Sequence, residues 1–200
     1  TIAPTKYFTY YSLAVLATVE RKNDKVRDYY RLMQKITPSN KLSTLYNAFA
    51  EIWMQNYSAA QILLLEVFPE FKQLEKVRIN DNNYLALVRF AKTLQETDKS
   101  QQAQKLLVRL GEYFQNHPVD HSSLIELSDV ETYSMLNDSE KAIDLLTQAI
   151  NLGWMPNYYK LKVSLERNPM LSNLEKLPEF QSLIDKVHRS QKEILSLVKQ

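Results

Sequence analysis

Short turn-forming segments recur along this chain, and each is followed a few residues later by a small or aliphatic residue. The residues that follow are separated by 34, 43 and 39 positions, and they are Val26, Ala60, Ala103 and Ala142. The preceding segments contain Asn23-Asp24, Asn56-Tyr57, Asp98-Lys99 and Asn137-Asp138. Self-similarity at a period of roughly 20–50 residues predicts an array of repeated supersecondary units. Because such arrays present an extended surface, binding is expected of this chain rather than chemistry.

Helical periodicity fills the segments on both sides of these turns. In the first unit, apolar residues recur at the spacing i, i+3, i+4 and i+7, at Tyr10, Leu13, Ala14 and Ala17. The pattern predicts a helix over about residues 6–21, a turn at 22–24 and a second helix over about 25–35. Pro38 then stops the second helix.

The same reading divides the chain into helix pairs and a terminal cap. The predicted pairs cover about residues 6–38, 41–69, 82–116 and 122–152, which together make a repeat region of residues 1–152. Residues 153–200 are predicted to be capping helices, because the open end of a helical array has to be covered. Tyr10, Tyr30 and Tyr133 are predicted to be core residues, and Leu42 is predicted to face inward from its helix.

Composition excludes several classes of protein. The chain has two glycines, too few for the tight turns of a β-rich fold or for a phosphate-cradling loop. It has no cysteine, so disulfides, thiolate zinc sites and cysteine nucleophiles are absent. Its 25 basic and 23 acidic residues are interleaved, which does not favour nucleic-acid binding. No apolar run approaches the length of a membrane span. No cofactor is expected either.

The residues of the first unit match the tetratricopeptide repeat in order and spacing, from Tyr10 through Val26, Tyr30 and Met33 to Pro38. Residues 138–143 and 149–150 match its second helix equally well. In the second unit, Asn47 and Glu51 lie near positions that the pattern makes apolar, which leaves the helix register there open by one residue. The chain therefore resembles a tetratricopeptide-repeat domain. The resemblance implies an all-α, right-handed solenoid of about four helix pairs with a C-terminal helical cap.

The end of the chain resembles a more particular group. Residues 149–154, 168–171 and 177–183, together with 82–103, are similar to the C-terminal repeat regions of bacterial membrane-anchored winged-helix transcriptional regulators and class III adenylate cyclases. This resemblance implies a sensory or scaffolding part of a larger regulatory protein. It favours the periplasm over the cytoplasm. The chain opens on Thr1 rather than on methionine, which favours a fragment or a processed product.

Candidate binding residues follow from the resemblance, which implies that the first helix of each pair lines a concave surface. Tyrosine and tryptophan are enriched in binding hot spots. The predicted partner-binding residues on this surface are Tyr11, Thr18, Tyr46, Trp53, Lys92 and Gln95.

Residues that could carry chemistry give weaker patterns. His117 and His121 are four apart, but Pro118 lies between them and no hydrolytic zinc motif surrounds them, so we expect a polar loop and no metal. The carboxylates, which include Glu126, Asp129 and Glu131, are expected on solvated helix faces. No catalytic residue is predicted.

The sequence thus favours a non-catalytic module that binds a protein or peptide. Two alternatives remain open at this point. One is a small-ligand sensor, which should show an enclosed pocket with a few convergent polar groups. The other is a regulatory region of a nucleotide cyclase.

Overall fold

The computed structural model describes residues 4–20, 22–37, 41–121, 126–156 and 164–198. These residues form helices and their connections, and no strand occurs among them. The predicted all-α class is therefore confirmed for the described chain. Within it, no helix is both long and apolar enough to cross a membrane.

The chain divides into two compact units. Unit 1 comprises residues 1–106 and 157–163, and unit 2 comprises residues 107–156 and 164–200. The division falls inside one helix, between Leu106 and Leu107. The proposed boundary between repeats and cap at residue 152 remains a prediction, but residues 164–198 belong to the same unit as the last predicted helix pair.

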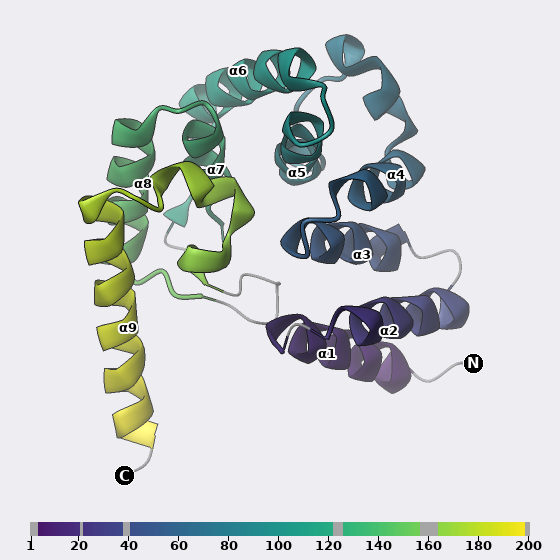
Figure 1. The fold of residues 1–200 in the computed structure, drawn as a ribbon, viewed down its shortest axis with the longest axis horizontal. Helices are drawn as coiled ribbons and strands as arrows, with labels where there is room; N and C mark the ends of the chain where they lie inside the picture. The colour runs from purple at the N-terminus through teal and green to yellow at the C-terminus, as the bar shows by residue number, and fades with distance from the viewer. Residues whose placement is uncertain (1–3, 21, 38–40, 122–125, 157–163, 199–200) are drawn as a thin grey trace. The chain divides into compact units, whose positions relative to one another are not determined.

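Unit 1 is built from consecutive helices that pack in neighbouring pairs. Figure 1 shows α1 lying against α2 and α3 against α4, and α2 also contacts α3. A 3-10 helix, η1, follows α4 and is followed by α5, which packs on α4. The elements are α1 (Pro4–Val19), α2 (Asn23–Ile36), α3 (Lys41–Trp53), α4 (Tyr57–Val67), η1 (Pro69–Lys76), α5 (Tyr84–Gln95) and the first part of α6 (Ser100–Asn116).

The repeated turns of the sequence have one shared hydrogen-bond geometry. At each turn, a backbone N–H donates to the carbonyl five residues earlier, from Lys22 to Ala17, Asn56 to Glu51, Lys99 to Leu94 and Asp138 to Tyr133. This bond closes the end of the first helix of each pair. Gln55, Asp98 and Asn137 precede three of these donors and have positive φ of 61°, 58° and 63°. Asn and Asp tolerate this left-handed conformation better than most residues.

The residue four positions after each closing donor is fully buried. Val26, Ala60, Ala103 and Ala142 each have 0% exposure, and each donates its N–H to the carbonyl of that closing residue. The internal similarity detected in the sequence is therefore a structural repeat of turn and helix start.

The predicted inward positions are mostly buried, with two corrections. Tyr30 and Tyr133 belong to the core, as predicted. Tyr10 is only half-buried and its ring stacks on that of Tyr29 at 6.3 Å. Leu42, in the first turn of α3, is 50% exposed, whereas its neighbours Ser43 and Thr44 are buried. Periodicity gave the correct face for the middle of that helix but not for its end.

Unit 2 surrounds one short helix. α7 is buried at every residue, including Asp129 and Glu131, and it packs against α8 and the 3-10 helix η5. Its core includes Trp154, Leu171 and Phe180. The elements are the remainder of α6, α7 (Ser128–Met135), α8 (Ser139–Asn151), η4 (Leu165–Arg167), η5 (Pro169–Leu174) and α9 (Pro178–Val198).

The last helix begins against this core and continues past it. Phe180, Leu183, Ile184 and Val187 of α9 are buried in the unit 2 core, whereas Ile194 is 51% exposed. Figure 1 shows the C-terminal half of α9 extending beyond α8. The first half of α9 is thus part of the unit 2 core, while the capping role of the final segment stays a prediction.

Enlarging the small residue at the α7–α8 crossing should destabilise unit 2. Ala142 has 0% exposure and lies in one cluster with Tyr133 and Leu146. Ala142→Leu is expected to lower the free energy of unfolding by about 1–2 kcal/mol, because the crossing has no room for the added side chain. Urea unfolding followed by circular dichroism measures the change. Ile143→Leu is the control, since Ile143 is only partly buried and a swap of equal volume is usually tolerated. Equal stability of both variants would contradict tight packing at residue 142.

Candidate functional site

Four aromatic side chains of helices α1 and α3 form a partly exposed surface in unit 1. We call it the aromatic strip, and it consists of Tyr7 and Tyr11 on α1 and Tyr46 and Trp53 on α3. All four are half-buried. Residues four or seven apart lie on one face of a helix, so each helix contributes its pair along one line. The sequence prediction included three of these residues and missed Tyr7, which the i, i+4 spacing from Tyr11 could have revealed.

Tyr11 and Tyr46 join the two halves of the strip. Their ring centroids are 5.0 Å apart with the planes tilted by 47°, and the Tyr46 ring meets that of Phe49 edge-on at 6.5 Å. Such aromatic contacts contribute roughly 0.5–1.5 kcal/mol beyond the area they bury. Burial, and then the neighbouring Tyr46, raise the pKa of Tyr11 well above its ordinary value. The Tyr11 phenol therefore remains neutral.

Tyr30 of α2 lies behind the strip. It is fully buried, and burial together with the nearby hydroxyls of Tyr11, Tyr46 and Tyr7 raises its pKa well above the ordinary value. Among the described residues, no protein group hydrogen-bonds the buried hydroxyls of Tyr7 and Tyr30 or the buried Asn47 Oδ1. Of these atoms, the Tyr7 hydroxyl belongs to the strip itself.

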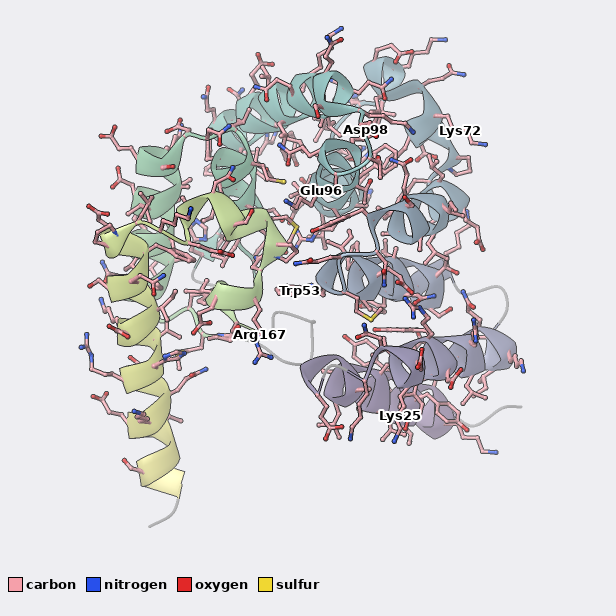
Figure 2. All side chains as sticks on the ribbon, in the orientation of Figure 1. Lys25, Trp53, Lys72, Glu96, Asp98 and Arg167 are labelled. Carbon is pink, nitrogen blue, oxygen red and sulfur yellow. The ribbon has the colours of Figure 1, made fainter. Side chains whose placement is uncertain are left out.

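Trp53 ends α3 on the same side as Tyr46. The two residues are seven apart, which is two helical turns, and Figure 2 shows Trp53 at the C-terminal end of α3. An aromatic side chain at this position extends the strip along α3. Thr18 was predicted to continue the α1 side, but its side chain lies outside the described part of the structure.

The two predicted residues on α5 have other surroundings. Lys92 is buried. Its Nζ lies 2.7 Å from Glu96 Oε1 and 5.8 Å from the ring centre of Tyr57. Gln95 is half-buried. Because Lys92 forms an ion pair with Glu96 and is buried, it stabilises the fold and is not presented to a partner. Periodicity could not reveal this, since α5 is buried from Ala86 to Leu94 on all sides.

A buried carboxylate fixes α3 against α2 beneath the strip. Glu51 Oε1 accepts from Arg27 Nε at 2.7 Å, and Oε2 accepts from Arg27 at 3.0 Å and from Asn56 Nδ2 at 2.8 Å. The Glu51 hydrogen bonds raise the pKa of Arg27, despite some opposing burial. This fork-shaped pair accounts for the acidic residue near a position that the repeat pattern makes apolar.

The histidines and carboxylates of unit 2 depart from expectation. His117 is exposed and stacks on Tyr113 at 4.5 Å, as a loop residue would. His121, by contrast, is buried, and its Nε2 lies 3.0 Å from Asp129 Oδ2 of the buried α7. Glu131 is also buried and accepts from Asn168 Nδ2 at 2.8 Å. The prediction of solvated positions for His121, Asp129 and Glu131 was wrong, because α7 is covered by η5 and its neighbours on every side.

The Asp129 carboxylate dominates the environment of His121. It is the largest cause raising the pKa of His121, and it outweighs the opposing effect of burial. The close approach of Nε2 to the Asp129 carboxylate, as a hydrogen-bonding contact, is the first cause of this shift, and the charge of Asp129 adds to it. The Glu126 carbonyl, 3.3 Å from Nδ1, and the charge of Asp120 act in the same direction.

These polar groups form structural pairs rather than a reactive set. Glu51, Asp129 and Glu131 each contact a partner from another element. Across the described ranges, no group of three or more His, Asp or Glu side chains is arranged to hold a metal ion. The partly exposed aromatic strip is consequently the best candidate for recognition in unit 1.

Comparisons of the chain with protein-family models, with curated proteins and with solved structures found no match.

Proposed function

We propose that this chain is a non-catalytic module that binds a protein or peptide through the aromatic strip of unit 1. The observation that carries the proposal is the contact between Tyr11 and Tyr46, which joins two helices into one half-exposed aromatic surface. Tyrosine and tryptophan bury large areas on binding at low entropic cost, which suits recognition. The aromatic surface of these two rings favours an apolar or aromatic anchor in the partner.

The repeated turn geometry supports a finer architectural proposal. Four turns share one closing hydrogen bond, and each precedes a fully buried residue at the same position. We extend this to a right-handed solenoid of about four tetratricopeptide-like pairs. On the resemblance alone, we further propose that the module is the sensory or scaffolding part of a larger bacterial regulatory protein, outside the cytoplasmic membrane.

Panning a random peptide library on the full chain tests the strip as a binding surface. Peptides selected on the unaltered protein should lose affinity by about fivefold or more for Tyr11→Ala and for Trp53→Ala, the usual size of a hot-spot loss. Ile62→Ala is the matched control, because Ile62 is 68% exposed on the second helix of its pair. It should leave the affinity unchanged, as measured by titration calorimetry.

Melting curves of the same variants separate recognition from folding. Both aromatic variants should stay folded, because both side chains are half-exposed. If they unfold as Ala142→Leu does, the strip is part of the core. If they melt normally and bind every selected peptide normally, recognition takes place on another surface and the proposal fails.

A further inference from the structure

The connection between α4 and α5 is anchored in the core of unit 1. Phe71 of η1 is 2% exposed, and its ring stacks on that of Phe68 at 4.8 Å with an interplanar angle of 7°. The same ring contacts Phe90 of α5 at 5.3 Å. This connection lies between the predicted helix pairs 41–69 and 82–116, and Phe71 packs it into the core. The side chains around Phe71 are therefore presented from a fixed backbone.

The second part of this connection is fixed by an asparagine. Asn83 is 9% exposed, its Oδ1 accepts from the Asn80 N–H at 2.9 Å, and its Nδ2 donates to the Arg78 carbonyl at 3.0 Å. Asn80 Oδ1 in turn accepts from the Asn82 N–H at 2.9 Å. These local bonds hold the backbone at Arg78.

A cavity of about 500 Å³ lies between these two anchored parts. This volume is in the range of sites that take small molecules. Val77 contributes to the wall, and the other lining residues are Pro69, Glu70, Gln73, Lys76, Arg78 and Asn83. All of them belong to unit 1.

The cavity wall carries two cations, Lys76 and Arg78, beside one carboxylate, Glu70. Among the described residues, neither Lys76 nor Arg78 forms an ion pair, whereas Arg27 and Lys92 do. Val77 between them is extended, with φ −71° and ψ 122°, so the residues on either side of it lie on one side of the backbone. The arginine offers a planar fork of donors and the lysine a compact charge, a combination suited to phosphate or carboxylate oxygens.

We propose that this cavity binds the oxyanion group, a phosphate or a carboxylate, of a small polar molecule. Arg78 and Lys76 contact the oxyanion, while the Gln73 amide and the Glu70 carboxylate are available to hydroxyl or amino groups on the rest of the ligand. The site is separate from the aromatic strip, because none of its lining residues belongs to α1 or α3. It does not depend on the proposed peptide binding.

Titration of the full chain with four salts tests the site. Inorganic phosphate and glucose 6-phosphate represent phosphates, citrate represents carboxylates, and sodium chloride at matched ionic strength measures general screening. Calorimetry and thermal melting are the readouts, since a ligand that binds the native state raises the melting temperature in a saturable way. We expect saturation with at least one of the three oxyanions and none with chloride. The responding salts identify the class of oxyanion.

Three charge-removing variants make the test specific. Arg78→Gln and Lys76→Gln should each weaken oxyanion binding by about tenfold, the size of a lost charge-assisted contact. Lys72→Gln is the control: Lys72 is on the same connection, does not line the cavity and projects away from the helices in Figure 2. It should bind as the unaltered protein does. Circular dichroism verifies that all three variants remain folded.

Two results would overturn the proposal. One is a response to all three oxyanions that is no larger than the response to chloride. The other is equal binding by Arg78→Gln, Lys76→Gln and Lys72→Gln, which would assign the response to diffuse surface charge.

Discussion

Arg27→Met is expected to lower the free energy of unfolding by about 3 kcal/mol, the typical cost of removing one partner from a buried ion pair. The Glu51 side chain is 4% exposed and receives two hydrogen bonds from Arg27. Without the arginine, the buried carboxylate keeps only the Asn56 amide, at 2.8 Å. Methionine retains most of the apolar stem of the arginine, so the loss reports on the charge rather than on packing. Urea unfolding followed by far-ultraviolet circular dichroism measures it.

A neighbouring arginine on the same helix provides the control. Arg31 is 68% exposed and lies 3.5 Å from an equally exposed Asp28, so Arg31→Met should cost less than about 0.5 kcal/mol. The double variant Arg27→Met/Glu51→Met should recover most of the lost stability, because an apolar pair of similar volume removes the unpaired charge. If Arg27→Met costs no more than Arg31→Met, the ion pair does not fix α3 on α2.

His121→Ala is expected to destabilise the protein by about 2–3 kcal/mol near pH 6, since hydrogen-bonded or paired charges contribute on this scale when buried. The substitution leaves the buried Asp129 carboxylate with the Val130 N–H, which donates to its Oδ1 at 2.8 Å. It also opens space beside α7. His117→Ala, four residues earlier, should change stability by less than about 0.5 kcal/mol, because the His117 side chain is exposed.

The His121 contribution should also depend on pH with a definite sign. Its pKa in the folded protein is raised, chiefly by Asp129, above the ordinary value of about 6.5. A group with a raised folded pKa binds its proton more tightly when folded, so its stabilisation is complete below that ordinary value. The stabilisation is lost as the pH rises through the folded pKa. The stability difference between the unaltered protein and His121→Ala should therefore shrink from about pH 6 to pH 8.

Chemical denaturation at several pH values measures this difference. Subtracting the His121→Ala curve removes the contribution of all other titrating groups that the substitution does not affect. A difference that stays constant or grows between about pH 6 and pH 8 would contradict the pairing with Asp129.

The repeated turns and helix pairs could be predicted from the sequence because they depend on neighbours along the chain. Asp98 and Asn137 adopt left-handed backbone at the predicted turns, and Ala60, Ala103 and Ala142 are buried where the period places them. Turn propensity and helical periodicity act within a few residues, so their effects are readable without knowledge of the packing. The contact between Tyr11 and Tyr46 joins two helices, and their predicted place on a concave binding face stays a prediction.

Burial of the polar residues depended on contacts between elements distant in sequence. Glu51 is paired with Arg27 from another helix, and Asp129 with His121 from the preceding connection. A charged residue on an amphipathic helix is indistinguishable in sequence from a solvated one until a second element covers it. The sequence by itself determined where the helices turn and which face each one buries at its centre. Only the tertiary structure decided that α5 and α7 are enclosed. It therefore also decided which charged side chains are buried in ion pairs or hydrogen bonds and which are exposed to solvent.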